Sequence, residues 1–179
     1  MTQITEYKSM NYLKQFPEEI QVQVLRDMLL QELLDEQLKM INYEPSLVQF
    51  IKNPSEKLQL AAITENKYAI EFIEDPSEKV QLAAVTQCGI SILYINNPSE
   101  KVQLAAVTQD GHAIEWIEDP SEKVQLAAVT ENGRAIEWIE EPSEKVQLAA
   151  VTENGRAIYQ IEDPSEKVKL VAKRKMNVF

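Results

Sequence analysis

The sequence contains very little cysteine, histidine or glycine. Of 179 residues, one is cysteine, one is histidine and four are glycine. A single cysteine cannot form a disulfide within the chain, which is typical of a protein kept in a reducing compartment. Cys88 and His112 are too few to supply the Cys and His ligands of a zinc site, and isolated glycines do not form a phosphate-binding loop. We therefore expect no metal, no cofactor and no enzymatic activity.

Long apolar runs and clusters of basic residues are also scarce. No run approaches the ~18 apolar residues of a membrane helix, and the first residues, MTQITEYKSMNYLKQF, lack the apolar core of a secretion signal. The formal net charge is −11, whereas contact with a phosphate backbone requires clustered Lys and Arg. We expect a cytoplasmic protein that binds neither a membrane nor nucleic acid directly.

The dominant feature of the sequence is an internal repeat. Residues 119–140 read DPSEKVQLAAVTENGRAIEWIE, and residues 141–162 are nearly identical to them. Prolines recur at positions 54, 76, 98, 120, 142 and 164 and set the period. Five full units therefore occupy residues 54–163, a half unit with a basic tail occupies residues 164–179, and residues 1–53 precede them as an N-terminal region. Such a period is the signature of a repeat architecture.

Each unit is expected to contain two helices. Asp119 can cap the first helix, Pro120 suits its first position, and Glu122 can reach back in a capping box. Gly133 stands where the C-terminus of a helix favours a left-handed residue, and Lys67 takes that place in the first unit, which predicts either slight strain or a different turn there. The second helix, RAIEWIE, has two turns at most and depends on packing.

The first helix of a unit has apolar residues on two faces, which indicates that it lies between neighbouring helices. No segment alternates in the way a strand does. We predict an all-α fold, a right-handed α-solenoid of five 22-residue two-helix repeats with an N-terminal capping helix and a C-terminal half repeat. The capping helix should span residues 17–42, followed by a degenerate half repeat at 45–53. Its apolar positions at helical spacing are Ile20, Val24, Met28, Leu29, Leu33, Leu34, Leu38 and Ile41. At the other end, the stack should be continued by Val168, Leu170, Val171 and Ala172.

The segment NPSEKVQLAAVTQDGHAIEWIEDPSEKVQLAAV resembles short α-helical repeat proteins of phage and bacterial genomes, whose function is unknown. These repeats are similar in the way their helical units stack to HEAT-like and variant leucine-rich-repeat solenoids. The resemblance to the phage and bacterial repeats covers residues 44–172. It implies a viral or bacterial origin and, by association, an inhibitor of host machinery. It supplies no catalytic residues to carry over, because families of this kind share architecture without sharing partners.

Positions that differ between units are the candidates for partner binding. One column holds Phe72, Tyr94, Trp116, Trp138 and Gln160, and it either packs the short helices together or forms an exposed aromatic ridge rimmed by Glu115, Glu118, Glu137 and Glu140. A second column, at the start of the short helices, holds Tyr68, Ile90, His112, Arg134 and Arg156. An invariant glutamine, Gln125 and its equivalents, is expected to form hydrogen bonds between repeats, with a polar binding strip as the alternative.

The second unit is the most divergent, because it reads QCGISILYINN where the third reads QDGHAIEWIED. Leu93 replaces a glutamate found in other units, so Ile90, Leu93 and Tyr94 should form an exposed apolar contact cluster. Local repacking is the other explanation.

Two functions remain after these exclusions, together with a third, structural possibility in which the chain assembles with itself through its exposed ends. The first is a non-enzymatic scaffold, monomeric or homodimeric, that binds a protein with a basic surface. Residues 54–163 contain eight basic and 20 acidic residues, net −12, which would steer such a partner. The alternative is an acidic nucleic-acid mimic that inhibits a host nuclease or another nucleic-acid-binding defence protein. The density of negative charge along the repeats is low for this role, because duplex DNA carries about one charge per 1.7 Å of axis.

Overall fold

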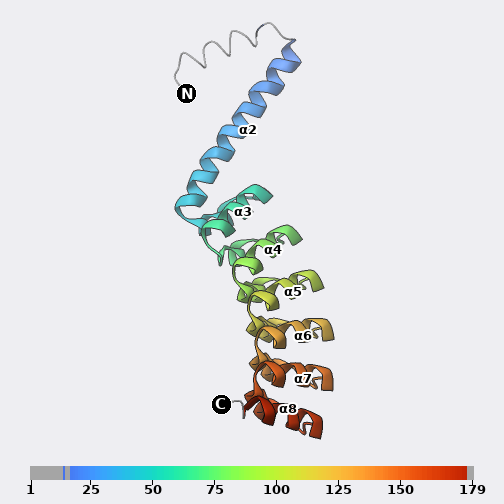
Figure 1. Ribbon diagram of the computed structural model, residues 1–179. Helices are drawn as coiled ribbons and strands as arrows, with labels where there is room; N and C mark the ends of the chain where they lie inside the picture. The colour runs from blue at the N-terminus through green and yellow to red at the C-terminus, as the bar shows by residue number, and fades with distance from the viewer. Residues whose placement is uncertain (1–13, 15–16, 177–179) are drawn as a thin grey trace.

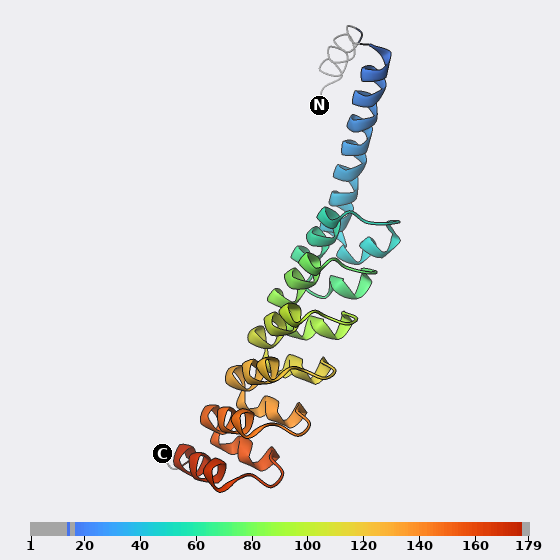
Figure 2. The ribbon, with the colours of Figure 1, turned by 90° about the vertical axis from the view of Figure 1, so that its right-hand side faces the viewer.

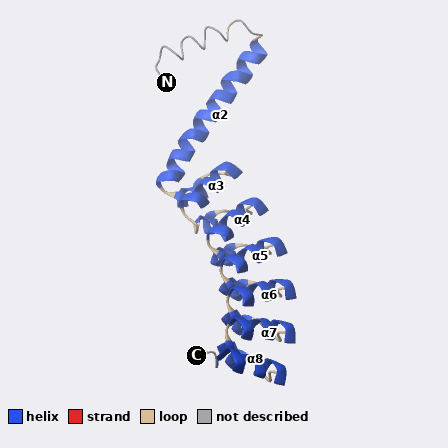
Figure 3. Ribbon diagram, viewed as in Figure 1, coloured by secondary structure: helices blue, strands red, loops and turns tan. Residues whose placement is uncertain are grey.

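The chain forms a single file of helical layers, with one long helix projecting from its N-terminal end (Figures 1 and 2). The structure is a computed structural model that describes Lys14 and residues 17–176. All the regular secondary structure of these residues is helical (Figure 3). The fold prediction of an all-α solenoid with a 22-residue period is therefore confirmed.

Ten-residue α-helices alternate with short 3-10 helices along the stack. In chain order the elements are α2 (Glu18–Tyr43), η1 (Pro45–Phe50), α3 (Glu56–Glu65), η2 (Ala69–Phe72), α4 (Glu78–Gln87), η3 (Gly89–Tyr94), α5 (Glu100–Gln109), η4 (Gly111–Trp116), α6 (Glu122–Glu131), η5 (Gly133–Trp138), α7 (Glu144–Glu153), η6 (Gly155–Gln160) and α8 (Glu166–Met176). The second helix of each repeat is thus a 3-10 helix, a distinction that the sequence prediction did not make.

The 3-10 geometry matches the pattern of burial in the short helices. Side chains three residues apart lie above one another in a 3-10 helix. In η5 and just after it, Ile136 and Ile139 are buried, while Arg134 and Glu137 are exposed. In the first unit, where Lys67 replaces glycine, η2 has only four residues instead of six. This is the altered turn that the sequence predicted.

The residue that caps the α-helix of each repeat, α3 to α8, is a serine, not the Asp, Asn or Glu two positions before it. The hydroxyl oxygen of Ser121 accepts a hydrogen bond from the backbone N–H of Val124 at 3.4 Å, a common N-cap arrangement. Asp119, which was predicted as the cap, instead adopts a left-handed conformation with φ of 45°. The prediction was wrong because Asp119 and Pro120 form the turn that leads into the helix.

The capping box is also replaced, because the glutamate faces the next repeat. Glu122 accepts a hydrogen bond from the Ser143 hydroxyl at 2.7 Å and lies 3.6 Å from the Lys145 ammonium. The same bond joins Ser77 to Glu56 at 2.9 Å and Ser165 to Glu144 at 2.7 Å. Each such contact, which we call a serine–glutamate rung, couples the N-termini of two successive α-helices.

The glycines permit close approach rather than a special backbone conformation. No glycine of the described chain has positive φ, so the predicted left-handed role is wrong. A Cβ atom on Gly133 would lie 2.5 Å from the backbone carbonyl oxygen of Ala150 in the next repeat, well inside van der Waals contact. A hydrogen atom is therefore the only side chain that fits at this distance between layers.

The core runs continuously through the stack, as the two-sided apolar pattern predicted. Helix α6 contacts α5 and α7 as well as η4 and η5. Val124, Ala128 and Val129 are completely buried, and Leu126 and Ala127 are partly buried against the same core. A single repeat exposes both of these faces, so its stability depends on its neighbours.

The capping helix α2 covers the stack only with its C-terminal end. Ile41 is completely buried, and Leu34 and Leu38 pack partly against the core. The rest of α2 projects beyond α3 (Figure 1), and four of its apolar positions at helical spacing are exposed. These are Ile20, Met28, Leu29 and Leu33. The periodicity predicted the helix correctly, but it could not show that the repeats cover only the C-terminal end of this helix.

None of the described helices has both the length and the apolar character needed to cross a bilayer.

The opposite end is closed by α8, which supplies the buried Val168 and Ala172. Val171 packs partly against the core, but Leu170 is exposed, because α8 is the last helix of the described residues. Lys173, Arg174 and Lys175 occupy its last turn, where positive charge is favourable to the helix dipole.

The close approach of repeats leads to a first prediction. Gly133→Ala should lower the free energy of unfolding by about 1–3 kcal/mol, because the added methyl group would overlap the Ala150 carbonyl. Denaturant unfolding followed by circular dichroism measures the change. Lys67→Ala is the matched control, since this position already carries a Cβ atom, and it should be nearly neutral. Equal effects of the two substitutions would contradict the role assigned to glycine.

The serine–glutamate rungs predict an acid-sensitive stack. The pKa of Glu56 is lowered from its ordinary value of 4.5 by hydrogen bonds from Lys79 and then Ser77. The pKa values of Glu78 and Glu122 are lowered mainly by hydrogen bonds from Ser99 and Ser143. A carboxyl group whose pKa is lower in the folded state stabilises the fold above its unfolded pKa, and this contribution is lost as the pH falls below about 4.5.

We therefore expect the Tm to fall as the pH is lowered below this value. A variant with Glu56→Gln, Glu78→Gln and Glu122→Gln should show a flatter dependence, and thermal unfolding across the pH range measures it. A control with Glu19→Gln, Glu32→Gln and Glu65→Gln removes the same number of charges and should retain the steeper dependence. If both variants behave alike, the rungs are not responsible.

Candidate functional site

The residues at the start of the short helices lie on the surface, in one column. Tyr68, Ile90, His112, Arg134 and Arg156 are all exposed. In four of the five the backbone is held by the residue two positions earlier: the side-chain oxygen of Asn132, for example, accepts a hydrogen bond from the Arg134 N–H at 3.0 Å, whereas Cys88 makes no side-chain bond of this kind at Ile90. Asp110 holds His112 in the same way at 3.0 Å. The column is therefore ordered at its backbone.

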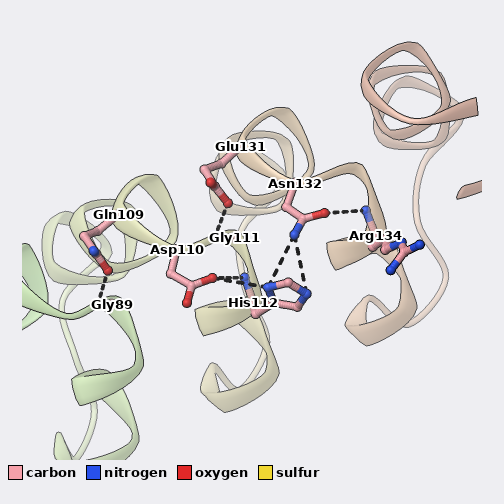
Figure 4. Close-up of polar contacts among 8 residues, drawn as sticks. All are labelled: Gly89, Gln109, Asp110, Gly111, His112, Glu131, Asn132 and Arg134. Atoms are coloured by element: carbon pink, nitrogen blue, oxygen red, sulfur yellow. Dashed lines mark hydrogen bonds and ion pairs between the residues drawn. The ribbon is translucent and has the colours of Figure 1, made fainter.

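Polar contacts also connect this column to the next repeat (Figure 4). The backbone N–H of Gly111 donates to the carboxylate of Glu131, and the N–H of Gly89 donates to the side-chain oxygen of Gln109. The ring nitrogens of His112 lie 3.3 and 3.4 Å from the side-chain nitrogen of Asn132. These contacts give His112 and the glycines a structural role between layers.

The aromatic column is half packed and half exposed. Phe72 is partly buried against the core, Tyr94 is 37% exposed, and Trp116 and Trp138 are each 44% exposed. Both interpretations of the sequence are thus partly right: the rings fill space between short helices and still present a free edge. Gln160, which ends the column, is also exposed.

Beside each aromatic residue lies a hollow in the surface, repeated along the stack. We number four of these hollows by their aromatic wall: Phe72 for the first, Tyr94 for the second, Trp116 for the third and Trp138 for the fourth. Their volumes lie between 470 and 570 Å³. Each is formed by the turn that leaves one short helix, the start of the next α-helix and the aromatic ring of the following repeat.

Carboxylates line the hollows and are shared between neighbours. Glu74 and Asp75 belong to both the first and the second hollow. Glu118 and Asp119 belong to both the third and the fourth. Asn96 is shared by the second and third hollows. The hollows therefore form one continuous row, which we call the hollow row, with acidic walls on either side of a neutral wall at Asn96.

The individual hollows also have carboxylates of their own. Glu71 lines the second hollow, and Glu115 and Glu140 line the fourth. Lys52 lines the first hollow and offsets part of its negative charge. The second and fourth hollows are consequently the most acidic.

The invariant glutamines form part of the hollow walls instead of linking repeats. The amide nitrogen of Gln125 donates to the backbone carbonyl of Pro120 in its own repeat at 3.0 Å. Gln59, Gln81, Gln103 and Gln147 make the same contact with their own prolines. The prediction of hydrogen bonds between repeats was wrong, because the short turn brings the glutamine back onto the carbonyl five residues earlier.

The second unit presents its divergent residues to solvent, as the sequence predicted. Ile90 is 37% exposed and Leu93 is 42% exposed. They are three residues apart in a 3-10 helix and therefore lie on one side of it. Leu93 also lines the third hollow, beside Trp116. Buried Ser91 donates a hydrogen bond to the carbonyl of Lys67 at 3.1 Å, which satisfies the altered turn of the first unit.

The structure unites only part of the predicted binding set. Phe72, Leu93, Tyr94, Glu115, Trp116 and Trp138 line the hollow row, whereas the residues that begin the short helices do not line these four hollows. Sequence reasoning placed Glu118 and Glu140 on the rim of the aromatic column, but it missed Asp119 and the sharing of walls between neighbouring hollows. The recurring acidic residue before each proline was visible in the sequence, but it was assigned to helix capping.

Known proteins supply no further identification. A scan against protein-family models and searches of curated proteins and solved structures found no match. Within the described residues, no group of three or more His, Cys, Asp or Glu side chains is arranged to hold a metal ion. Arguments about function therefore rest on the geometry and charge of the surface.

Left-handed residues shape the turns of the hollow row, and one of them is poorly suited to this conformation. Asn53, Asp75, Asn97, Asp119 and Asp163 have φ between 44° and 52°, which Asn and Asp tolerate best among residues other than glycine. Glu141 has φ of 46° and lacks the short side chain that eases it.

Replacing this glutamate should therefore stabilise the protein. Glu141→Asn is expected to raise the free energy of unfolding by about 0.5–1 kcal/mol, measured by denaturant titration. Asp119→Asn, which exchanges one tolerated residue for another in the preceding repeat, is the control and should change stability little. A lower free energy of unfolding in Glu141→Asn would show that the Glu141 carboxylate stabilises the fold by more than the left-handed backbone of a glutamate destabilises it.

Proposed function

We propose that this chain is a non-enzymatic scaffold that binds another protein through the hollow row. The observation that carries the proposal is the recurrence, in four successive repeats, of an aromatic side chain beside carboxylates in a hollow. Aromatic residues with a packed side and a free side are frequent anchors of interfaces. A row of them on ordered helices offers a partner several anchoring points without the cost of ordering a loop.

The chemistry of the hollow row favours a basic partner. Aromatic faces attract Arg and Lys cations, and carboxylates pair with the same groups. The net charge of −12 over residues 54–163 adds long-range attraction. The resemblance to phage and bacterial repeats supports a role in which a phage or bacterial protein modulates a protein of the cytoplasm, for example as its inhibitor.

The alternative, an acidic nucleic-acid mimic, is supported less well by the same surface. A mimic needs closely spaced negative charge along its whole length. The second unit interrupts the negative charge, because Leu93, Asn96 and Asn97 stand where most other units have Glu or Asp. Many of the remaining carboxylates lie in hollows beside aromatic rings, an arrangement suited to receiving side chains.

The tryptophan walls give the test of this function. Immobilised protein should retain specific proteins from a bacterial lysate, and the double variant Trp116→Ala, Trp138→Ala should reduce their capture at least about tenfold, because it removes two anchors of the size found at interface hot spots. Quantitative mass spectrometry measures the difference.

The control removes two aromatic side chains that are more exposed and lie outside the four hollows. Tyr43 is 89% exposed and Tyr159 is 78% exposed, so Tyr43→Ala, Tyr159→Ala should leave capture intact. Retention of the same proteins by the tryptophan variant would refute the proposed surface. If the addition of duplex DNA released the captured proteins, the result would favour the nucleic-acid mimic instead.

A further inference from the structure

The spacing of the hollow row restricts the shape of a partner segment. Equivalent points on successive repeats are separated by the distance between packed helices, about 8–10 Å. The hollows recur once per repeat because each is built from the same turn, glutamine and aromatic position. A segment that fills consecutive hollows must therefore present a side chain on one side at this same interval.

A polyproline II segment meets this requirement. It has three residues per turn and rises about 3.1 Å per residue, so every third side chain lies on the same side and about 9 Å further along. A β-strand places side chains on one side about 6.6 Å apart, which falls between the hollows. An α-helix matches the spacing only at about every seventh residue.

The walls of the hollows favour arginine at these positions. A guanidinium group stacks on an aromatic face and at the same time pairs with a carboxylate through two parallel hydrogen bonds. The fourth hollow offers Trp138 together with Glu115, Glu118 and Glu140. The second offers Tyr94 together with Glu71 and Glu74. Lysine pairs with carboxylates but lacks the planar group that stacks.

We propose that the hollow row binds an extended, polyproline-like segment with arginine at every third residue, one arginine per repeat. This inference rests on the proposed function and specifies its ligand. The continuity of the row supports it, because neighbouring hollows share the walls Glu74 with Asp75 and Glu118 with Asp119. A bound segment thus passes from one hollow to the next without leaving the acidic surface.

The neutral wall between the second and third hollows makes the proposal testable by a gain of binding. Asn96 and Asn97 stand where the neighbouring repeats have Glu74 and Asp75, or Glu118 and Asp119. Asn97 has φ of 48°, close to the 44° of Asp75, so aspartate fits its backbone. The double variant Asn96→Glu, Asn97→Asp completes the acidic lining without disturbing the fold.

The probe is a fluorescein-labelled peptide of four Arg-Pro-Pro triplets, measured by fluorescence anisotropy. The proline content excludes an α-helix. A second peptide has the same composition with its four arginines contiguous, so its charge is identical. We expect the spaced peptide to bind at least about tenfold more tightly than the contiguous one, because only the spaced peptide places a cation on each aromatic face. Emission from Trp116 and Trp138, the two tryptophans of the chain, should change on binding.

Variants of the protein complete the test. Trp138→Ala should weaken binding of the spaced peptide about tenfold, and the double variant Asn96→Glu, Asn97→Asp should strengthen it severalfold. Glu32→Gln, Glu65→Gln removes two exposed carboxylates outside the hollows and should change the affinity little, in contrast to Glu118→Gln, Asp119→Asn. Equal affinity for the two peptides, or no gain in the double variant, would overturn the proposed spacing.

The outcome also separates this inference from the function on which it rests. If neither peptide binds, but the tryptophan variant still loses proteins captured by the wild type, the polyproline segment is refuted and protein binding by the hollow row stands. If that variant keeps the captured proteins, the hollow row is not the binding surface and both proposals fail.

Discussion

The close approach of each repeat to the next is the constraint on which this molecule depends. Gly133 leaves no room for a Cβ atom against the Ala150 carbonyl, and the glutamate at the start of one α-helix accepts a hydrogen bond from the serine that caps the next. Between these two contacts, each α-helix buries residues on both of its long sides. A repeat is consequently stable only between neighbours.

The same contacts divide the surface into parts with different roles. The N-terminal ends of the α-helices carry the serine–glutamate rungs, which couple the layers. The turns that precede those helices, together with the aromatic residues of the short helices, form the hollow row. Substitutions in the hollow row therefore leave the main contacts between layers in place. The differences between hollows, such as Leu93 in the third and Glu140 in the fourth, show that this surface varies while the packing does not.

The sequence was sufficient to predict the architecture, because a 22-residue period with apolar residues on two helical faces has few other solutions. Local chemistry was predicted less well. Asp119 and Ser121 are both good helix caps, and only the backbone conformation shows that the serine has this role while the aspartate forms the turn. Gly133 fits both a left-handed cap and a tight interface, and the choice depends on Ala150, which belongs to the next repeat. The hollows depend on three segments meeting in space, so no local pattern could predict them.

The interchangeable junction between repeats has a consequence for the gene that encodes the chain. The serine of one unit donates to the glutamate of the unit before it at four of the junctions, and at the junction after Glu100 the ammonium of Lys123 pairs with that glutamate at 2.9 Å. Unequal recombination that removes or adds the coding length of one unit would therefore produce a chain whose new junction has the same contacts as the old one. Such an event changes the number of hollows by one without requiring compensating mutations. Selection can thus lengthen or shorten the binding surface by one repeat at a time without changing the contacts that stabilise the junctions.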